Sequence, residues 1–320
     1  METGSAVPPG EAYRALEAEV GKVIRGQSAV IQQMVVTVLC KGHALLEGVP
    51  GTAKTLMVRT LARLVSAQFR RIQFTPDLMP SDIVGTNVFD LQHNAFRLRK
   101  GPIFTDLLLA DEINRTPAKT QAALLEAMQE RQVTIDGQSE SLGDLFTVFA
   151  TQNPIEYEGT YRLPEAQLDR FLMKILVDYP SAEDEDRILQ AYDSGQELHE
   201  LKDTVPAILK PETLRALRAG VIRTKVEPAL LKYIREIVWA TRSSDAILVG
   251  CGPRASIHLL YASKALAPLR DRDFATPDDI QEMAFPVLRH RIVLQPEAEV
   301  EGLTADEALR QVIKTVKVPR

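Results

Sequence analysis

Two short stretches of this sequence combine residue types that bind phosphate and activate water. The first, GVPGTAKT, covers residues 48–55 and stands between an apolar run and a helical pattern. A glycine-rich loop between a strand and a helix directs backbone N–H groups into one concavity, where they hold phosphate oxygens. Lys54 would add a cation for the β and γ phosphates, and Thr55 a hydroxyl ligand for Mg²⁺. The stretch therefore predicts a nucleotide site.

One position of this loop departs from the usual pattern, because Ala53 stands where glycine is common. Gly48 and Gly51 permit tight turns and a close approach of the phosphates. We expect a negative φ at Ala53, since the helix should begin there, whereas a positive φ would strain the loop. On this stretch alone, a glycine-rich turn without a ligand stays open as the alternative.

The second stretch, DLLLADE (106–112), places two acids at the end of an apolar run. In open α/β sheets, ligands bind outside the carboxyl ends of the strands. There Asp111 would hold Mg²⁺, directly or through water, and Glu112 would act as general base on the attacking water. A solvated strand end is the alternative. The two acids, however, come one strand and one helix after a phosphate loop, and that position favours a catalytic role.

Three more residues are candidates for the same site. Asn153, in FATQNP, follows another apolar run and could orient the lytic water or sense the γ-phosphate, although alone it would be a turn residue before Pro154. Arg170, in QLDRF, and Arg254, in GPRAS, add cations. Phosphoryl transfer often uses an arginine from a neighbouring subunit, but each of these alone would be an ordinary surface arginine.

Short apolar runs alternate with helical patterns, which predicts a mainly parallel sheet covered on both faces. The predicted strands are ALLEG (44–48), RIQF (71–74), DLLLADE (106–112), FTVFATQNP (146–154) and FLMKILV (171–177). One helix should start with Thr116 as its cap and Pro117 in its first turn. After Pro180 only helical signals follow, with the clearest start at Thr276, where a cap, a proline and acids coincide.

These signals divide the chain into a flexible tail (1–10), an α/β nucleotide-binding core (11–180) and an all-helical domain (181–320). Two inserts interrupt the core. Residues 75–104 contain two strand-like pieces, and residues 132–141 contain a hairpin turn at Asp136 and Gly137. A plain surface loop is the alternative for both inserts.

The composition is that of a globular protein, with 45% hydrophobic and 25% charged residues. A net charge of −5 counts against a dedicated nucleic-acid binder. The two cysteines, Cys40 and Cys251, lack metal-site spacing and fit idle thiols in a reducing compartment. We find no signal peptide, and the longest apolar stretch is too short for a bilayer. We therefore expect a soluble, cytoplasmic protein.

Five motifs in this order, GVPGTAKT, LLLADEINR, ATQNP, PEAQLDRF and GPRAS, resemble those of the AAA+ ATPases, and within them the MoxR family. The resemblance extends from about residue 11 to residue 310. It implies ATP or ADP and Mg²⁺ as ligands, with VIRGQ (23–27) beside the adenine. The implied nucleotide contacts are Ile24, Gly26, Gly48, Val49, Pro50, Gly51, Thr52, Ala53, Lys54, Thr55 and Leu56.

The resemblance also implies roles for the remaining candidates. Asp111 and Glu112 would form Walker B, with Thr55 and Asp111 as Mg²⁺ ligands. Asn153 would be sensor 1, Arg170 the arginine finger, Arg254 sensor 2 and Arg115 a second interface residue. The helical domain would be the lid, with nucleotide between it and a sheet of strand order 5-1-4-3-2. Residues 161 and 162 read Tyr-Arg where the family often has Tyr-Pro, which would alter the approach to the finger.

The function implied by this resemblance is Mg²⁺-dependent ATP hydrolysis, at the β–γ phosphoanhydride bond, between the subunits of a homo-oligomeric ring. The ring expected is a closed, head-to-tail hexamer. The two inserts resemble hairpins that face a ring's pore or a partner. By kinship, the ring would remodel or mature a client protein, often one with a von Willebrand factor A domain. We expect no nucleic-acid partner and no membrane insertion.

Two other classes of function stay open. A nucleic-acid motor would show DNA-stimulated ATPase activity, and the net charge counts against it. A nucleotide-gated binding module would bind ATP without hydrolysing it. The complete set of Lys54, Asp111, Glu112, Asn153 and Arg170 counts against that class.

Overall fold

The structure is a computed structural model that describes residues 9–153, 161, 163–196 and 205–319. Residues 1–8 of the expected tail lie outside the described residues, and so do Pro154 and Arg162. The first helix, α1 (Pro9–Val23), begins before the boundary that we predicted at residue 11. Among the described residues, none of the helices combines the length and the apolar character needed to cross a membrane.

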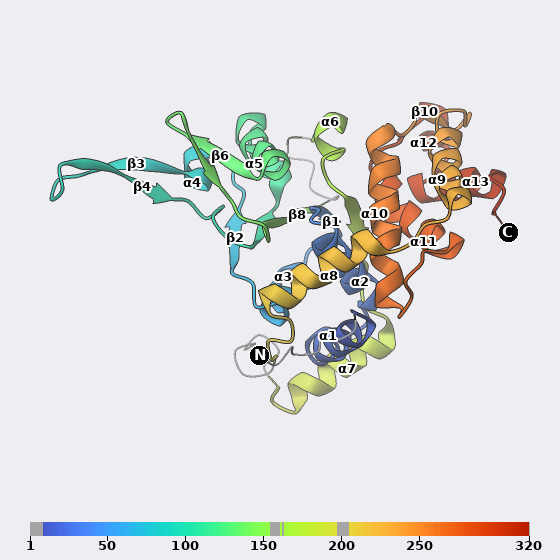
Figure 1. The fold of residues 1–320 in the computed structure, drawn as a ribbon, viewed down its shortest axis with the longest axis horizontal. Coiled ribbons are helices and arrows are strands. Elements are labelled where there is room, and N and C mark those ends of the chain that lie inside the picture. The colour runs from blue at the N-terminus through green and yellow to red at the C-terminus, as the bar shows by residue number, and fades with distance from the viewer. Residues whose placement is uncertain (1–8, 154–160, 162, 197–204, 320) are drawn as a thin grey trace.

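A five-stranded parallel sheet forms the centre of the sheet domain (Figure 1). Its strands are β1 (Ala44–Glu47), β2 (Phe69–Gln73), β5 (Leu107–Asp111), β8 (Thr147–Gln152) and β9 (Met173–Leu176), and they lie in the order β2-β5-β8-β1-β9. Counted along the chain, this is the predicted order 5-1-4-3-2. Because every pair is parallel, all carboxyl ends lie at one edge of the sheet.

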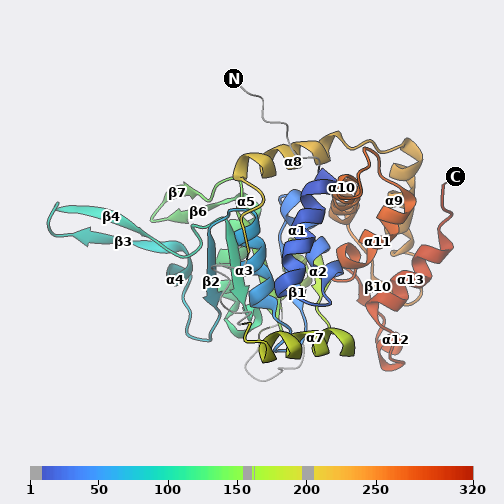
Figure 2. The same ribbon diagram turned by 90° about the horizontal axis from the view of Figure 1, so that it is seen from below.

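Helices cover both faces because successive strand residues point to opposite sides. Leu46 and Leu109 belong to a buried cluster shared with α1, α2 and α3, which Figure 2 shows on one side of the sheet. Leu45 and Leu108 belong to a second cluster, shared with α4 and α5. The helices are α2 (Ser28–Leu39), α3 (Lys54–Leu64), α4 (Pro80–Val84) and α5 (Ala118–Glu130). Burial on both faces explains why the strands are continuously apolar.

The start of α5 differs from the prediction. Pro117 is the N-cap, and the helix begins one residue later, at Ala118. The hydroxyl of Thr116 does not cap the helix, because it donates to the carbonyl oxygen of Thr75 at 3.0 Å. A tertiary contact therefore uses the side chain that the local pattern assigned to capping.

The second half of the chain is mainly helical, but it is not all-helical as we predicted. Two short strands, β10 (Ile247–Val249) and β11 (Val293–Leu294), pair antiparallel. At this length a strand shows no periodic signal. The helices are α7 (Ala182–Asp193), α8 (Pro211–Arg223), α9 (Pro228–Ala240), α10 (Pro253–Leu269), α11 (Pro277–Leu288), α12 (Pro296–Val300) and α13 (Ala305–Thr315). Helix α11 begins as predicted, with Thr276 and Asp279 forming a capping box.

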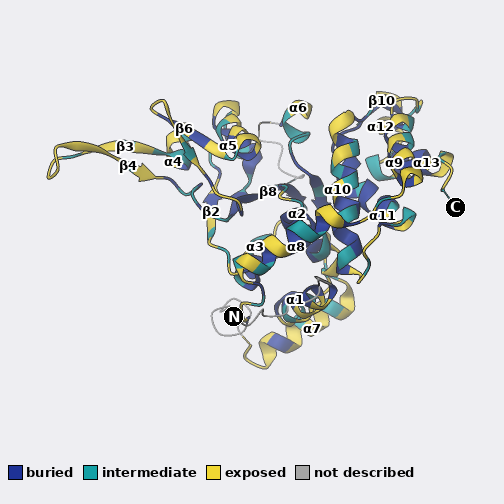
Figure 3. Ribbon diagram, viewed as in Figure 1, coloured by how far each residue is buried: buried dark blue, intermediate teal, exposed yellow. Residues whose placement is uncertain are grey.

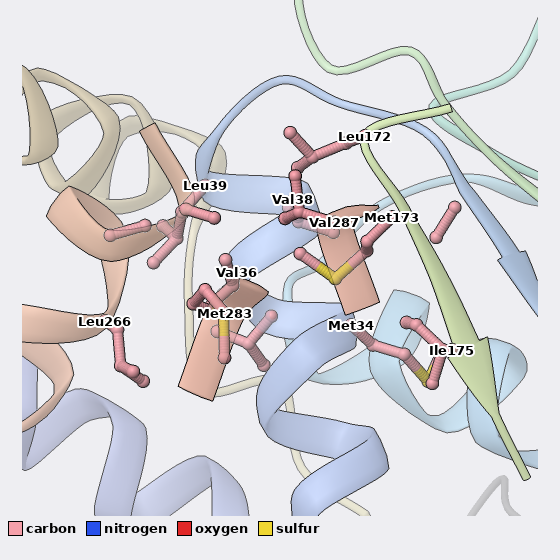
Figure 4. Close-up of a cluster of buried hydrophobic side chains, with 14 of the residues drawn as sticks. Met34, Val36, Val38, Leu39, Leu172, Met173, Ile175, Leu266, Met283 and Val287 are labelled. Atoms are coloured by element: carbon pink, nitrogen blue, oxygen red, sulfur yellow. The ribbon is translucent and has the colours of Figure 1, made fainter. Parts of the chain in front are cut away.

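One apolar cluster joins this helical part to the sheet (Figure 4). It contains Met34 of α2, Met173 of β9, Leu266 of α10 and Met283 of α11. The hydrophobic core thus continues across the domain boundary that we predicted near residue 180, and that boundary stays a prediction.

The two inserts form hairpins. Strands β3 (Gly85–Asp90) and β4 (Ala95–Lys100) pair antiparallel and extend from the end of the molecule opposite the helical part (Figure 1). Most of this hairpin is exposed (Figure 3). Strands β6 (Gln132–Ile135) and β7 (Gln138–Ser141) meet at Asp136 and Gly137, with φ values of 49° and 81°. Two positive φ values are the mark of the predicted hairpin turn.

Candidate active site

The phosphate loop begins directly after β1, and its last two residues, Lys54 and Thr55, are the first two of α3. Gly48 approaches the backbone after β9 so closely that a Cβ atom there would lie 2.2 Å from the carbonyl oxygen of Val177. Gly51 has a φ of 85°, which residues with a Cβ atom rarely adopt. The hydroxyl of Thr52 donates to the carbonyl oxygen of Val49 at 3.0 Å. The loop is therefore a tight turn that these glycines make possible.

Ala53 adopts a left-handed conformation, with φ 60° and ψ 22°. Our expectation of a negative φ was wrong, because the helix begins at Lys54 and Ala53 belongs to the turn before it. A side chain at a left-handed position costs about 1–2 kcal/mol. The loop thus carries strain that the usual glycine would avoid.

The ammonium group of Lys54 lies over this loop. Its Nζ donates to the carbonyl oxygens of Gly48 and Val49, each at 2.7 Å, and to the hydroxyl of Thr52 at 3.3 Å. Burial lowers the pKa of Lys54, whereas the nearby carboxylates of Asp111 and Glu112 act in the opposite direction. Lys54 therefore places its charge between the loop and the two acids.

Asp111 ends β5 and is oriented from both neighbouring strands. Its Oδ2 accepts two hydrogen bonds from Arg71 of β2, from Nε at 3.0 Å and from Nη2 at 2.6 Å. Its Oδ1 accepts one from the hydroxyl of Thr151 in β8, whose oxygen also accepts from the backbone N–H of Glu112 at 2.8 Å. The Asp111 side chain is only 13% exposed. Strands β2 and β8 thus fix the direction of this carboxylate.

Glu112 follows in a left-handed conformation, with φ 56° and ψ 50°. Strained backbone of this kind occurs often at functional sites. Its Oε2 accepts a hydrogen bond from Nη1 of Arg115 at 2.9 Å. Arg115 ends the short helix η1 (Ile113–Arg115), so this arginine contacts the candidate general base of its own chain.

These residues line one cavity of about 480 Å³ at the carboxyl ends of the strands. Its lining residues are Pro50, Gly51, Thr52, Ala53, Lys54, Thr55, Leu56, Arg59, Asp111, Glu112, Thr151, Gln152 and Asn153. Three sequence motifs therefore meet as predicted. All of these lining residues belong to the sheet domain. The expectation that nucleotide lies between the core and the lid therefore stays a prediction.

The residues of the predicted adenine border stand beside the phosphate loop. Ile24 and Gly26 are not among the lining residues of that cavity. They stand between α1 and α2, where the side-chain amide of Gln27 donates to the carbonyl oxygen of Asp178 at 2.9 Å. Asp178 follows Val177, which contacts Gly48. The turn at residues 24–27 thus adjoins the start of the phosphate loop.

Arg170 and Arg254 lie together, but not at the phosphate loop. Both line a second cavity, of about 310 Å³, together with Lys41 and Arg131. This cavity adjoins the amino-terminal ends of β1 and β9, where the N–H of Leu172 donates to the carbonyl oxygen of His43 at 2.7 Å. The four residues of β1 separate the two cavities, a span of about 13 Å at roughly 3.3 Å per residue.

The oxygen ligands expected for Mg²⁺ are present, since Thr55 and Asp111 line the first cavity. A hydroxyl and a carboxylate suit Mg²⁺, which takes few protein ligands and completes its shell with water and phosphate oxygens. The described residues contain no cluster of three or more His, Cys, Asp or Glu that could hold a metal ion. Thr55 and Asp111 would leave most of the coordination of the metal to water and phosphate oxygens.

Several residues that orient the predicted ones were missed by the sequence argument. Thr151 stands two positions before Asn153, and Asp169 directly precedes Arg170, so both lay within motifs that we had quoted. Arg71 reaches Asp111 from another strand, 40 positions away in the chain, and no local pattern marks it.

Comparison with known proteins gives the family. Residues 43–173 match the model of the ATPase family associated with various cellular activities (AAA), and residues 239–312 match that of an AAA lid domain. Chaperone MoxR1 of Mycobacterium tuberculosis is 44% identical over 94% of this chain and 81% of its own length. Protein MoxR of Paracoccus denitrificans is 33% identical, over 90% of each chain. The chain belongs to the MoxR family of AAA+ ATPases.

Two further relatives of this MoxR-family protein agree with that conclusion. The uncharacterised protein YeaC of Bacillus subtilis is 46% identical over 94% of this chain and 92% of its own. A solved structure from Cytophaga hutchinsonii, described as a candidate ATPase, superposes with a TM-score of 0.89 at 41% identity. That likeness covers 98% of this chain and 96% of the other. The AAA+ core and its lid are therefore shared along nearly the whole chain.

Proposed function

We propose that this MoxR-family protein is a Mg²⁺-dependent ATPase whose catalytic sites are shared between neighbouring subunits of a ring. The observation that carries this proposal is the separation of Arg170 and Arg254 from the phosphate loop. Since the two arginines line a cavity at the opposite edge of the sheet, each would act on the nucleotide of the next subunit. Such a head-to-tail contact closes into a ring, for which we propose six subunits.

In this site each side chain has a separate task. Lys54 would balance the charge of the β and γ phosphates, and Thr55 and Asp111 would hold the metal. Mg²⁺, when bound, would neutralise charge on the phosphate oxygens. Glu112 would take a proton from the attacking water, which Asn153 would orient.

Arginines from the next subunit would complete the site. Arg170 would approach the γ-phosphate, and Arg254, which lines the same cavity, would act from the same side. Their charges would stabilise the negative charge that spreads over the transferred phosphoryl group. Cleavage of the β–γ bond would then depend on assembly.

We further propose that hydrolysis drives remodelling or maturation of a client protein, with a von Willebrand factor A domain protein as partner. The name of the M. tuberculosis relative, a chaperone, supports the general role. The exposed β3–β4 hairpin supports a contact with a client, because Phe89 and Phe96 expose 43% and 72% of their surface there.

Two of the basic residues of that hairpin are paired with carboxylates, which counts against a nucleic-acid partner. Arg97 pairs with Asp90 at 3.1 Å, and Lys100 pairs with Glu140 at 3.3 Å. Carboxylates therefore offset charges that phosphate groups would otherwise attract. We also propose a cytoplasmic location. We further propose a division between core and lid near residue 180, because the two family matches fall on either side of it.

Mixing two inactive variants tests the shared site. Glu112→Gln would lack the general base but keep its arginines, whereas Arg170→Ala would lack the finger but keep its phosphate loop. A 1:1 mixture that reassembles should recover activity at roughly a quarter of its sites, because random assembly pairs one intact half with the other. Arg235→Ala, on the exposed face of α9, is a matched control that should retain full activity. A mixture no more active than its components would contradict the proposal.

A further inference from the structure

One buried arginine of the helical part holds the backbone on both sides of Arg170. Arg291 lies between α11 and β11, and its side chain is 1% exposed. Its Nη2 donates to the carbonyl oxygens of Asp169, at 3.2 Å, and Phe171. Its Nη1 donates to that of Leu172 at 3.2 Å. The segment that carries Arg170 therefore cannot turn without breaking hydrogen bonds to a buried charge.

The same guanidinium group also binds side chains. Its Nε donates to Oδ1 of Asp169 at 2.9 Å, and its Nη2 donates to Nδ1 of His258 at 2.6 Å. Burial lowers the pKa of His258 to about 3, so this ring is neutral and its Nδ1 accepts. Arg291 is thus surrounded by acceptors, as a buried guanidinium requires.

Asp169 links Arg291 to Arg254. While Oδ1 binds Arg291, Oδ2 accepts a hydrogen bond from Nη1 of Arg254 at 2.9 Å. The carboxylate lies between two positive charges, which would otherwise repel each other. Asp169 therefore directs the Arg254 side chain, and as the chain neighbour of Arg170 it also sets the backbone of that residue.

We propose that Arg291 and Asp169 are positioning residues that hold Arg170 and Arg254 as one rigid unit at the subunit interface. This inference rests on the proposed function, in which both arginines serve the neighbouring nucleotide. Because Arg291 belongs to the helical part, a movement of that part carries both arginines together. A misplacement of about 1 Å at a catalytic group can cost on the order of 10²-fold in rate.

The substitution Asp169→Asn separates this role from simple folding. The asparagine Oδ1 can still accept from Arg291, whereas its amide nitrogen replaces the oxygen that binds Arg254. Asp306→Asn is a matched control, because Asp306 also receives two hydrogen bonds from one arginine of the helical part, Arg289, at 2.9 and 2.8 Å. Neither of these two hydrogen bonds of Asp306 involves Arg170 or Arg254.

We expect Asp169→Asn to lower kcat by roughly 10- to 100-fold while KM for ATP changes by less than about twofold, since its own phosphate loop is intact. Asp306→Asn should keep the wild-type kcat. Arg291→Lys, which keeps the charge but cannot reach every carbonyl oxygen, should behave as Asp169→Asn does. A wild-type kcat for Asp169→Asn in the assembled protein would overturn the inference.

Subunit mixing gives a readout that a merely structural role would not move. Asp169→Asn subunits mixed with Glu112→Gln subunits should recover activity, because the latter supply well-placed arginines. Mixed with Arg170→Ala subunits, they should show no activity beyond the residual rate of Asp169→Asn alone, because neither kind of subunit supplies a well-placed finger. If only the pair of Arg170→Ala and Glu112→Gln recovers, the positioning role is overturned and the shared site stands. If that pair also fails, both are overturned.

Discussion

Thr151 and Asp111 come from neighbouring parallel strands and are joined by a hydrogen bond in which the hydroxyl donates to the carboxylate. The same hydroxyl oxygen accepts from the backbone N–H of Glu112 at 2.8 Å. One buried side chain therefore fixes both the candidate metal ligand and the residue that carries the candidate general base.

Replacing this threonine should separate its hydroxyl from its shape. Thr151→Val keeps the volume but removes a hydrogen bond to a charged group, worth about 1.5–3 kcal/mol. We expect kcat to fall roughly 10- to 100-fold and more Mg²⁺ to be needed for half-maximal rate, whereas Thr151→Ser should stay close to wild type. Steady-state ATPase assays across a Mg²⁺ titration measure both effects. Equal activity of the valine and serine variants would show that the hydroxyl is not used.

Ala53 offers a test of the strain in the phosphate loop. At its φ of 60°, glycine removes about 1–2 kcal/mol of strain but adds roughly 0.4–1 kcal/mol of unfolded-chain entropy. Ala53→Gly should therefore raise the unfolding free energy by up to about 1.6 kcal/mol. Ala122→Gly, at an exposed position inside α5, should lower it by about 1 kcal/mol. Denaturant melts compare the two, and a loss of stability in both would mean that Ala53 is unstrained.

Buried histidines should make stability depend on acidity. Burial, with a further contribution from Arg131, lowers the pKa of His43 to about 3. The unfolded chain then binds more protons than the folded one as pH falls from about 6.5 towards 3, so stability present above pH 6.5 is lost over that range. For one such histidine the loss reaches about 2 kcal/mol at pH 5.

A variant without the titrating ring tests this pH dependence. We expect His43→Gln to be less stable than wild type at pH 7.5, because it loses the ring's packing and its hydrogen bonds to Met128 and Val148. Its unfolding free energy should fall less steeply towards pH 5. Urea melts at the two pH values give both quantities. Parallel pH profiles for the two proteins would rule out His43 as a source of the dependence.

The aromatic pair on the β3–β4 hairpin should serve binding and not folding. Phe89 and Phe96 contact each other edge to face, with centroids 5.2 Å apart, on a hairpin that is mostly exposed. The double change to serine should therefore leave the melting temperature and the basal ATPase rate unchanged. It should abolish any stimulation of ATPase activity by a permanently unfolded polypeptide, such as reduced and carboxymethylated α-lactalbumin. Full stimulation in the variant would exclude these rings from client contact.

Local patterns were sufficient for the sheet and its carboxyl edge. The five strands, the turn at Asp136 and Gly137, and the meeting of Lys54, Asp111 and Asn153 in one cavity follow from motifs within a few residues of each strand end. The strand order came from the resemblance to the AAA+ ATPases and not from any local pattern. The conformation of Ala53 did not follow, because it depends on where the helix begins, to within one residue. Element boundaries of this kind depend on tertiary contacts that a single sequence does not display.

Long-range ion pairs were beyond the same approach. Arg291 donates a hydrogen bond to Asp169, which lies 122 positions away, and Arg71 donates to Asp111 on the neighbouring strand. Neither arginine is marked by a local sequence pattern. The strands β10 and β11 were missed because they are too short to show alternation. The residues that carry chemistry were thus more visible in the sequence than those that hold them in place.

The most direct test of the shared site is the rate of ATP hydrolysis per subunit, measured against protein concentration for wild type and Arg170→Ala. We predict that the wild-type rate rises with concentration and then saturates as rings assemble. The variant should stay at least about 10³-fold lower at saturation, as expected for loss of an arginine finger. A wild-type rate that does not change with concentration, together with full activity of Arg170→Ala, would contradict the account.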